Sequence, residues 1–226
     1  MGAVDSSSGQ ARGQARGETR GEATRREIIR VARRLFSEHG YHHTGISDIQ
    51  TATGLTKGAF YHHFRTKEAL ALAVLELARA DYGEHLFGPV ASIASPGRRA
   101  AALLEAALDL NRRPQWCNCR MMATLIAELT VADERLHGAV LDMQKTMFEG
   151  WRDLLAEAQR AGEANAAIDP GVGAQLILNA MTGGLMTRKI GNEQAPLEAV
   201  IEVIKQTLLT DAVLQPPVEG PADPPA

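Results

Sequence analysis

The side chains best suited to recognition chemistry gather in residues 56–67. Gly58 and Ala59 are small, so a helix that begins here can approach base edges closely, with the Ala59 methyl available to a thymine methyl. Other side chains can donate hydrogen bonds to phosphates and fix the register of a bound duplex; these are Thr56, Tyr61, His62 and Lys67. Together with Lys57, these residue types predict contact with double-stranded DNA.

The same stretch gives little support to a metal or catalytic site. His62 and His63 are adjacent, and neighbouring side chains on a helix point about 100° apart, which makes a shared metal ion difficult. The sequence has no metal-ligand cluster, glycine-rich phosphate loop or Ser-His-Asp set at a usable spacing. We therefore expect neither an enzyme nor a bound metal or cofactor.

Two short helices must position the recognition residues. Residues 46–53 and 56–64 are expected to be helical, and only Gly54 and Leu55 separate them, which is the spacing of a helix-turn-helix. Gly54 suits the left-handed backbone that such a turn needs. The pair is expected to share a small core with a preceding helix, built from Ile49, Leu55, Phe60 and Phe64.

That preceding helix is longer. Thr24 and Glu27 have the spacing of a capping box at its start, and Gly40 supplies its end. The three helices make up a predicted DNA-binding domain over residues 23–66. Residues 1–22 repeat Arg and Gly and are expected to form a disordered arm, which either enters a minor groove or only solubilises the chain.

The rest of the chain is also predicted to be helical, so the fold class is all-α with about nine helices. Apolar residues recur at helical spacing, and no stretch alternates like a half-buried strand. Further helices are expected over residues 67–86, 96–112, 122–129, nearly thirty residues after Asp133, 170–188 and 196–210. They form a regulatory domain over residues 67–213, followed by a disordered proline-rich tail over residues 214–226.

Charge separates the two domains. Residues 1–70 hold 11 Lys and Arg against 7 Asp and Glu, whereas the remainder holds 13 against 20. A basic unit on an acidic body is typical of a nucleic-acid reader joined to a non-binding domain. No run approaches the ~18 apolar residues of a membrane span, and the N-terminus lacks the core of a secretory signal, so we expect a cytoplasmic protein without a membrane partner.

Residues 25–75 resemble the TetR family of bacterial transcriptional regulators. The resemblance lies in Leu35-Phe36 and Gly40-Tyr41, in residues 54–64, and in Lys67-Glu68-Ala69-Leu70. It implies that the second short helix reads DNA through Lys57, Gly58, Ala59, Tyr61, His62 and His63, with phosphate contacts from Thr44, Ser47 and Lys67.

Two residues depart from the family pattern. Gly45 stands where the family usually has Thr or Ser as the cap of the second helix, but Gly is only slightly worse as a cap, so the helix should survive. Gln50 replaces an Ala where the two short helices cross. It either tilts the recognition helix or points outward toward a phosphate.

The resemblance also implies a homodimer formed by the last two helices. The residues predicted at this interface are Gly183, Gly184, Leu197, Val200, Ile201, Ile204 and Leu208. The final helix carries this apolar stripe where a monomer would have little left to cover it, and glycines allow backbones to cross closely. Two-fold symmetry would place recognition helices in successive major grooves and predicts a palindromic operator.

A small-molecule effector is the third implied partner. Large or polarizable side chains on the middle helices suit a pocket for an apolar or amphipathic ligand, although ordinary core packing stays an alternative for each. These residues are Trp116, Cys117, Met121, Met122, Met147, Phe148, Trp151, Asn179, Met181 and Met186. Cys117 and Cys119 are too few for a disulfide framework or structural zinc. They flank Asn118 at a helix start, which leaves redox or electrophile sensing open beside the simpler interpretation of plain buried cysteines.

Together these features predict a homodimeric repressor that binds a palindromic operator, associates with the nucleoid when bound, and is released by a ligand. The helix that begins at Lys67 is expected to couple the two domains, because it leaves one and enters the other. A non-sensing architectural DNA-binding protein is the alternative from another class. It agrees less well with an acidic chain.

Overall fold

The computed structural model describes residues 19–113, 116, 118–191 and 195–215, and within these ranges every regular element is helical. Ten of the elements are α-helices, the last of them a single turn. This confirms the all-α fold class. No helix in these ranges combines the length and the hydropathy that a membrane span requires.

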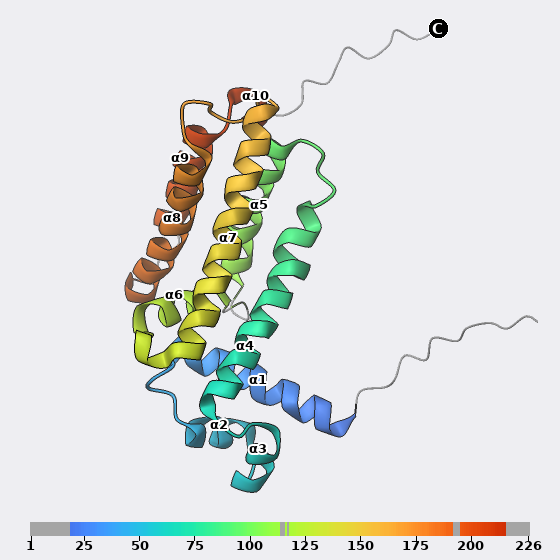
Figure 1. Cartoon of the computed structure of the whole chain (residues 1–226), viewed down its shortest axis with the longest axis vertical. Helices are drawn as coiled ribbons and strands as arrows, with labels where there is room; N and C mark the ends of the chain where they lie inside the picture. Colours follow the sequence, from blue (N-terminus) through green and yellow to red (C-terminus); the bar gives the residue numbers. More distant parts are fainter. Residues whose placement is uncertain (1–18, 114–115, 117, 192–194, 216–226) are drawn as a thin grey trace, which may run out of the picture.

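Three helices at one end of the molecule form the helix-turn-helix unit: α1 (Arg20–His39), α2 (Ile46–Thr53) and α3 (Lys57–His63). α1 crosses the lower ends of the longer helices, and α2 and α3 lie below it, at the end of the molecule opposite α10 (Figure 1). The bounds of α2 and α3 agree with the prediction to within one residue. Gly54 between them has the predicted left-handed conformation, with a φ angle of 67°.

The start of α1 differs from the prediction. Thr24 is not the cap; instead Thr19 accepts a hydrogen bond from the Glu22 backbone N–H, and the Glu22 carboxylate accepts one from the Thr19 N–H. Thr19–Glu22 and Thr24–Glu27 have the same capping spacing, and the earlier set prevails because it allows more turns of intrahelical bonds. Residues 19–22 of the predicted arm therefore form the cap and start of α1, and residues 1–18 lie outside the described residues.

α4 (Lys67–Tyr82) runs from the DNA-binding unit into the bundle, as predicted. Its α-helical hydrogen bonding ends at Tyr82, before the predicted end at residue 86. After Tyr82 the chain continues as a π-helical turn (Gly83–Phe87) and a 3-10 turn (Gly88–Val90). The helical path therefore passes the predicted end at residue 86, although the α-helical bonding ends before it.

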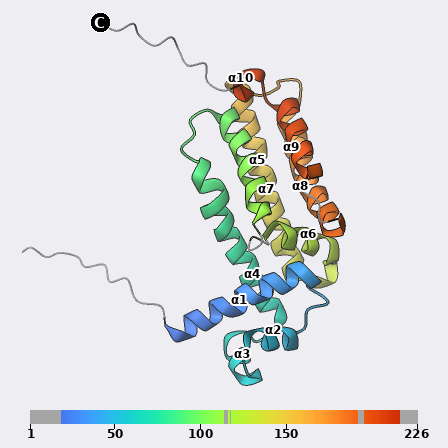
Figure 2. The ribbon, with the colours of Figure 1, turned by 180° about the vertical axis from the view of Figure 1, so that it is seen from behind.

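The remaining helices form the bundle: α5 (Pro96–Arg112), α6 (Asn118–Glu128), α7 (Glu134–Arg160), α8 (Pro170–Gly191), α9 (Ala195–Leu208) and α10 (Asp211–Leu214). α7 contacts α4, α5, α6 and α8, while α9 packs on α8 and α5. From behind, α4 lies at one edge of the bundle and α8 with α9 at the other (Figure 2). α10 carries the helical chain into the predicted tail; residues 216–226 lie outside the described residues.

Two clusters of buried apolar side chains hold these helices together. One joins the DNA-binding unit to α4, α6 and α7, and includes Phe36, Phe60, Leu70, Met121 and Leu136. The other fills the bundle around Leu104, Trp151, Ile177 and Ile201. Because α6 supplies Met121 to the first cluster, the core of the DNA-binding unit extends beyond the predicted domain boundary at residue 66.

Candidate DNA-binding site and regulatory pocket

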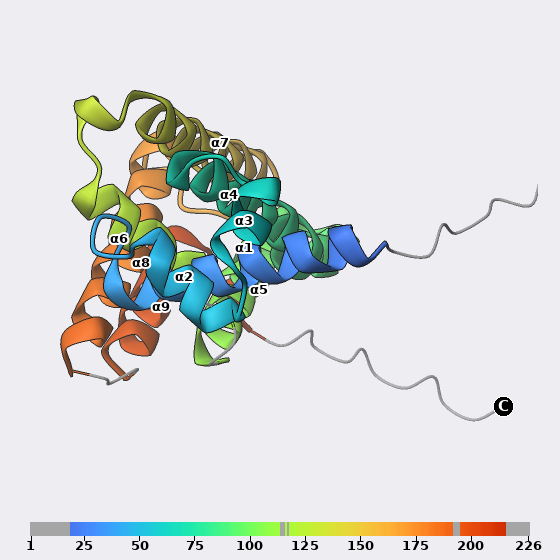
Figure 3. The same cartoon turned by 90° about the horizontal axis from the view of Figure 1, so that it is seen from below.

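α3 is held in place by apolar residues on its inner side. Phe60 and Ile49 are fully buried, and Phe64 packs near Phe60 with ring centroids 6.4 Å apart. Thr56 caps the helix by accepting a hydrogen bond of 3.3 Å from the Ala59 N–H. These contacts fix which face of α3 points outward. α3 itself lies at the end of the molecule that is turned toward the viewer in Figure 3.

The outward face carries most of the predicted DNA contacts. Ser47, Lys57, Gly58 and His62 are exposed, as is Tyr61, whose exposed fraction is 40%. Thr56 is exposed beside its cap bond, whereas Ala59 and His63 are half-buried. Lys57, Gly58, Tyr61 and His62 thus share an accessible side of α3, and Ser47 is exposed on the neighbouring helix α2. Their contacts with DNA stay a prediction.

The structure contradicts the predicted phosphate contact from the Thr44 side chain. This side chain is 1% exposed, and its hydroxyl donates to the backbone carbonyl oxygen of Gly40 at 2.7 Å, with that of Leu35 at 3.3 Å. A hydroxyl buried in this way cannot reach a phosphate in the present conformation. Thr44 instead closes the turn after α1.

Lys67 lies at the edge of the site but faces the protein. Its Nζ is 4.4 Å from the centre of the Tyr41 ring and donates to the His42 carbonyl oxygen at 3.4 Å. Burial lowers the pKa of Lys67, and the nearby carboxylates of Glu128, Asp133 and Asp48 oppose that change. A phosphate contact from Lys67 therefore requires its side chain to leave Tyr41.

The two departures from the family pattern have different outcomes. Gly45 begins α2 as expected, because the Asp48 carboxylate accepts a hydrogen bond of 2.7 Å from the Gly45 N–H and so supports the helix start. Gln50 is half-buried rather than turned outward, and its Nε2 is buried without a hydrogen-bond partner in the described part of the chain. A phosphate contact from Gln50 is therefore not favoured in this conformation.

One residue beside the recognition helix was not among the sequence predictions. The guanidinium of Arg25 in α1 lies 5.0 Å from the centre of the Phe64 ring, so it adds positive charge just beyond the end of α3. The Arg-rich start of α1 is visible in the sequence, but its proximity to Phe64 depends on how α1 packs against α3.

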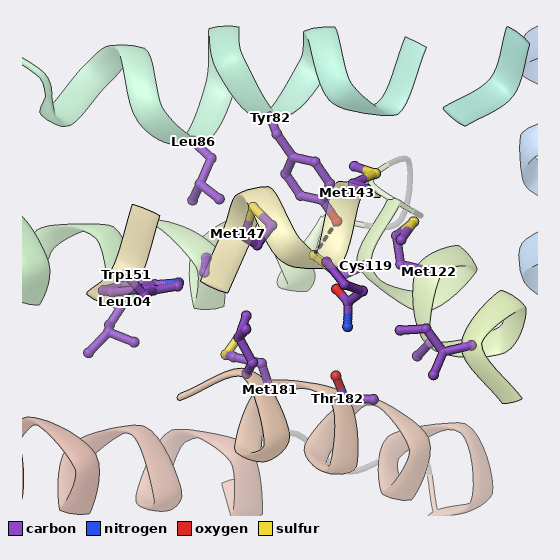
Figure 4. A pocket seen from close by; sticks show the side chains of 15 residues that line it. Tyr82, Leu86, Leu104, Cys119, Met122, Met143, Met147, Trp151, Met181 and Thr182 are labelled. Atoms are coloured by element: carbon purple, nitrogen blue, oxygen red, sulfur yellow. Dashed lines mark hydrogen bonds between the residues drawn. The ribbon is translucent and has the colours of Figure 1, made fainter. Parts of the chain in front are cut away.

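A cavity of about 80 Å³ lies inside the bundle, with walls from α4, α5, α6, α7 and α8 (Figure 4). Its lining is mostly apolar and rich in sulfur, with Cys119, Met122, Met143, Met147 and Met181. Polar groups come from Tyr82, Gln144 and Thr182. Figure 4 shows Tyr82 pointing in from α4 and Met181 from α8, on opposite sides of the space.

Four of the predicted pocket residues line this cavity: Met122, Met147, Trp151 and Met181. Five others do not. Met121 is fully buried in the first cluster, Asn179 is exposed and accepts from Gln175, and Trp116, Phe148 and Met186 lie outside the lining. Adjacent helical residues face different sides, so Met121 and Phe148 turn away where Met122 and Met147 turn in. Cys117 lies outside the described residues.

A polar contact within the pocket joins Tyr82 to Cys119. The Tyr82 hydroxyl donates to Cys119 Sγ at 3.2 Å, which joins α4 to α6 (Figure 4). From the sequence, Cys119 is expected to be a redox-active residue or a plain buried cysteine, and it is not among the predicted pocket residues. Its spacing of three residues from Met122, which puts both on one helix face, was the signal for a place in the pocket.

A larger groove of about 640 Å³ lies outside the pocket, between α4 and α7. Tyr82, Met143 and Met147 line both the groove and the inner cavity. The outer groove is more polar, with Glu76, Arg79, Asp142 and Thr146 along it, and Arg79 pairs with Glu76 at 2.9 Å. Two methionines and a tyrosine thus separate an apolar space from a polar one.

Most of the residues predicted at a dimer interface are used within the chain itself. Leu197, Ile201, Ile204 and Leu208 are buried against the bundle, and a Cβ on Gly184 would collide with Leu197, so this stripe is not a free surface. These four leucine and isoleucine side chains are not available to a partner chain, because α5 and α8 cover them, and the rest of the predicted interface stays a prediction. Val200 and Gly183 are exposed, and further exposed apolar residues lie at Val172, Leu176 and Val203.

These features define the class of protein. A helix-turn-helix presents a polar recognition helix at one end, and the same chain holds a cavity in an all-α domain that shares a core with it. This is the arrangement of a DNA-binding regulator with a built-in regulatory domain.

Comparison with known proteins establishes the family. Residues 28–74 match the model of bacterial regulatory proteins of the tetR family, and residues 96–204 match that of the tetracyclin repressor-like C-terminal domain. The chain belongs to the TetR family and is a DNA-binding transcriptional regulator, related to repressors.

Among its relatives, the HTH-type transcriptional repressor NemR of Escherichia coli K12 is 29% identical over 84% of this chain and 96% of its own length. The HTH-type transcriptional repressor KstR2 of Rhodococcus jostii RHA1 is 30% identical over 64% of this chain and 70% of its own. A TetR transcriptional regulator from Chloroflexus aurantiacus J-10-FL has a similar crystal structure, with a TM-score of 0.75, 28% identity and coverage of 84% and 98%.

Proposed function

We propose that this chain is a ligand-released repressor, which works in the cytoplasm as a homodimer and binds a palindromic operator in nucleoid DNA. The observation that carries the proposal is the inner pocket. It is walled by α4 and α6, and both helices also pack against α1 of the DNA-binding unit. A molecule in that pocket therefore acts on the two helices that hold the unit in place.

The exposed side of α8 and α9 supports the homodimer. Val172 and Leu176 on α8 have exposed fractions of 62% and 41%, and Val200 and Val203 on α9 have 42% and 61%. Each pair has helical spacing, so each helix presents an apolar strip outside the bundle. Adjacent exposed strips of this kind favour association with a second copy, with α8 and α9 of both chains in contact.

The size and lining of the pocket support a small apolar or amphipathic effector. Pockets for drug-sized ligands measure roughly 300–1,000 Å³, so the inner cavity must expand to accept one. Methionine side chains adapt readily, and Met143 and Met147 separate the cavity from the polar groove. Their displacement would give one continuous site, with room for an apolar body inside and a polar end near Asp142 and Thr146.

Selection of bound sequences from a random pool of double-stranded DNA tests the proposal. We expect a palindrome whose half-sites are about one helical turn apart. The enriched duplex then serves as the probe for an effector screen, in which a bound compound should weaken operator affinity. Binding that depends on salt but enriches no sequence would contradict the proposal and support the architectural alternative.

A second candidate function is regulation through a cysteine, and the position of Cys119 favours it. Its thiol lies in the pocket wall beside the Tyr82 hydroxyl, where an electrophilic ligand can reach it. Addition of the thiol across the double bond of N-ethylmaleimide serves as a test. Loss of operator binding in the wild type and in Cys117→Ser, but not in Cys119→Ser, would support this function; an equal response in all three would contradict it.

A further inference from the structure

A partly buried charge joins the DNA-binding unit to the two helices that carry the pocket. Arg33 of α1 forms an ion pair with Asp81 of α4, and its Nη1 also donates to Asn118 Oδ1 of α6 at 3.1 Å. Asn118 Nδ2 donates to Asp81 Oδ2 at 3.3 Å, which closes a triangle of side chains. Arg33 is 15% exposed and Asn118 is fully buried, so solvent screens these contacts only in part.

The same two turns of α4 and α6 also form the pocket contact. Asp81 precedes Tyr82, and Asn118 precedes Cys119, whose thiol accepts the Tyr82 hydrogen bond. Adjacent side chains on a helix point about 100° apart, so one pair can face the cavity while its neighbours face α1. The spacing of α4 and α6 at this level therefore determines both contacts.

A second hydrogen bond ties the other neighbour of Cys119 to α1. Arg120 Nε donates to Ser37 Oγ at 2.6 Å, and Ser37 is fully buried. Arg33 and Ser37 lie four residues apart on α1, hence on one face of that helix. The start of α6 is thus fastened to α1 on both sides of the pocket cysteine.

We propose that Arg33, Asp81 and Asn118 form a latch that transmits the state of the pocket to the DNA-binding unit. This inference rests on the proposed function, because it describes how an occupant releases operator DNA. An occupant that separates Tyr82 from Cys119 also separates Asp81 from Asn118, so Arg33 can no longer bond to both.

Burial of Arg33 gives the latch its direction. Its Nε is buried and has no hydrogen-bond partner in the described part of the chain, so the guanidinium relies on Asp81 and Asn118. A largely buried charge that loses a partner is unfavourable, and a shift of α1 would let the guanidinium regain water. Since α1 packs on α2, such a shift moves the helix-turn-helix away from its DNA-competent position.

The test uses a covalent occupant of known position. In a Cys117→Ser background, methyl methanethiosulfonate transfers a methylthio group to the Cys119 thiolate and releases methanesulfinate. The added group is expected to displace the Tyr82 hydroxyl from the Cys119 sulfur, because the two atoms are in contact in the unmodified protein. Operator affinity is then measured by fluorescence anisotropy before and after modification, with the duplex obtained from the selection experiment.

Two further proteins complete the test. Arg33→Met combined with Asp81→Asn removes both charges together, which avoids an unpaired buried charge and leaves Asn118 an amide partner. Arg30→Met is the matched control, because Arg30 lies on the outer side of the same helix, pairs with Glu27 and is 60% exposed. Thermal unfolding verifies that each protein is folded at the assay temperature.

Methylthiolation should weaken operator binding about tenfold in the background protein and in the Arg30→Met control. The double variant should bind about tenfold more weakly without modification and show no further loss after it, because both changes open the same latch. An equal additional loss in the double variant, or unchanged affinity of the modified background protein, would overturn the latch and leave the proposed function standing. Absence of operator binding by the unmodified protein would instead refute the proposed function.

Discussion

The DNA-binding unit and the regulatory bundle place their functional side chains in opposite ways. In the unit, Lys57, Tyr61 and His62 point outward from a short helix that Phe60 holds rigidly from within. In the bundle, the functional side chains point inward around a small cavity, and several are flexible methionines. The recognition surface presents a fixed pattern of side chains, whereas the cavity can change its shape.

This difference shows how one chain can combine specificity with responsiveness. A fixed recognition surface suits an operator of constant shape, whereas an adaptable cavity allows a ligand to alter helix spacing. α6 belongs to both regions, because Cys119 and Met122 line the pocket while Met121 and Asn118 face α1 or its core. The two regions are therefore mechanically joined, although their surfaces differ.

Removal of the aromatic support in the unit should have the largest effect. Phe60→Ala leaves a void in a fully buried site and should cost about 3–5 kcal/mol of stability, with loss of operator binding. Met147→Ala, on the half-buried wall of an existing cavity, should cost less. Urea denaturation of both variants measures the difference. Equal costs would contradict the contrast between a rigid unit and an adaptable pocket.

Changes on the recognition face should affect DNA binding without affecting the fold. Lys57→Ala and Tyr61→Ala should each weaken operator binding by about 1–3 kcal/mol, because each side chain is exposed on the outward face of α3. Lys145→Ala, which removes an exposed lysine from α7, is the control and should bind normally. Fluorescence anisotropy measures the affinities. Normal binding by both α3 variants would refute the assignment of this face.

A charge on the outer side of the bundle should weaken the dimer. Val203→Asp introduces a carboxylate into the exposed strip of α9, and burial of that charge between two chains should raise the dimer dissociation constant about tenfold. Val131→Asp is the matched control, because Val131 is 83% exposed and lies before α7. Sedimentation measures the dissociation constants. An equal effect of both changes would place the interface elsewhere.

The smallest effect is expected at a surface contact between the two regions. The Asp133 carboxylate accepts a hydrogen bond from the Thr130 N–H and lies near His42, and these contacts lower the pKa of Asp133. The resulting stability is present above the unfolded-state pKa and is lost as the pH falls through the lower folded-state value. Asp133→Asn should therefore reduce the loss of unfolding free energy as the pH falls, measured by urea denaturation below pH 5. An unchanged pH dependence of the unfolding free energy would exclude this contribution.

The helix-turn-helix could be predicted closely because local signals determine it. Gly54 marks the turn, Thr56 caps α3, and the apolar residues around Phe60 fix the outward face. The failures in this region were tertiary: Thr44 looks like an accessible hydroxyl in sequence, but the chain folds back and buries it against the end of α1.

The bundle was less predictable because its residues take their roles from distant helices. The spacing of Leu197, Ile201 and Ile204 predicts an apolar face, but only the packing of α5 and α8 determines that the face is internal. The pocket likewise depends on Tyr82, Leu104 and Cys119, which lie on three different helices. No local pattern in the sequence brings such residues together.

A change in operator spacing tests the central claim most directly, because it requires both regions at once. Two recognition faces held by one dimer can read two half-sites only at a fixed separation. Insertion of about half a helical turn, roughly 5 base pairs, between the half-sites of the selected operator should reduce affinity at least about tenfold in fluorescence anisotropy. Unchanged affinity would mean that the recognition helices bind independently, and would contradict the claim that the bundle controls DNA binding by setting their spacing.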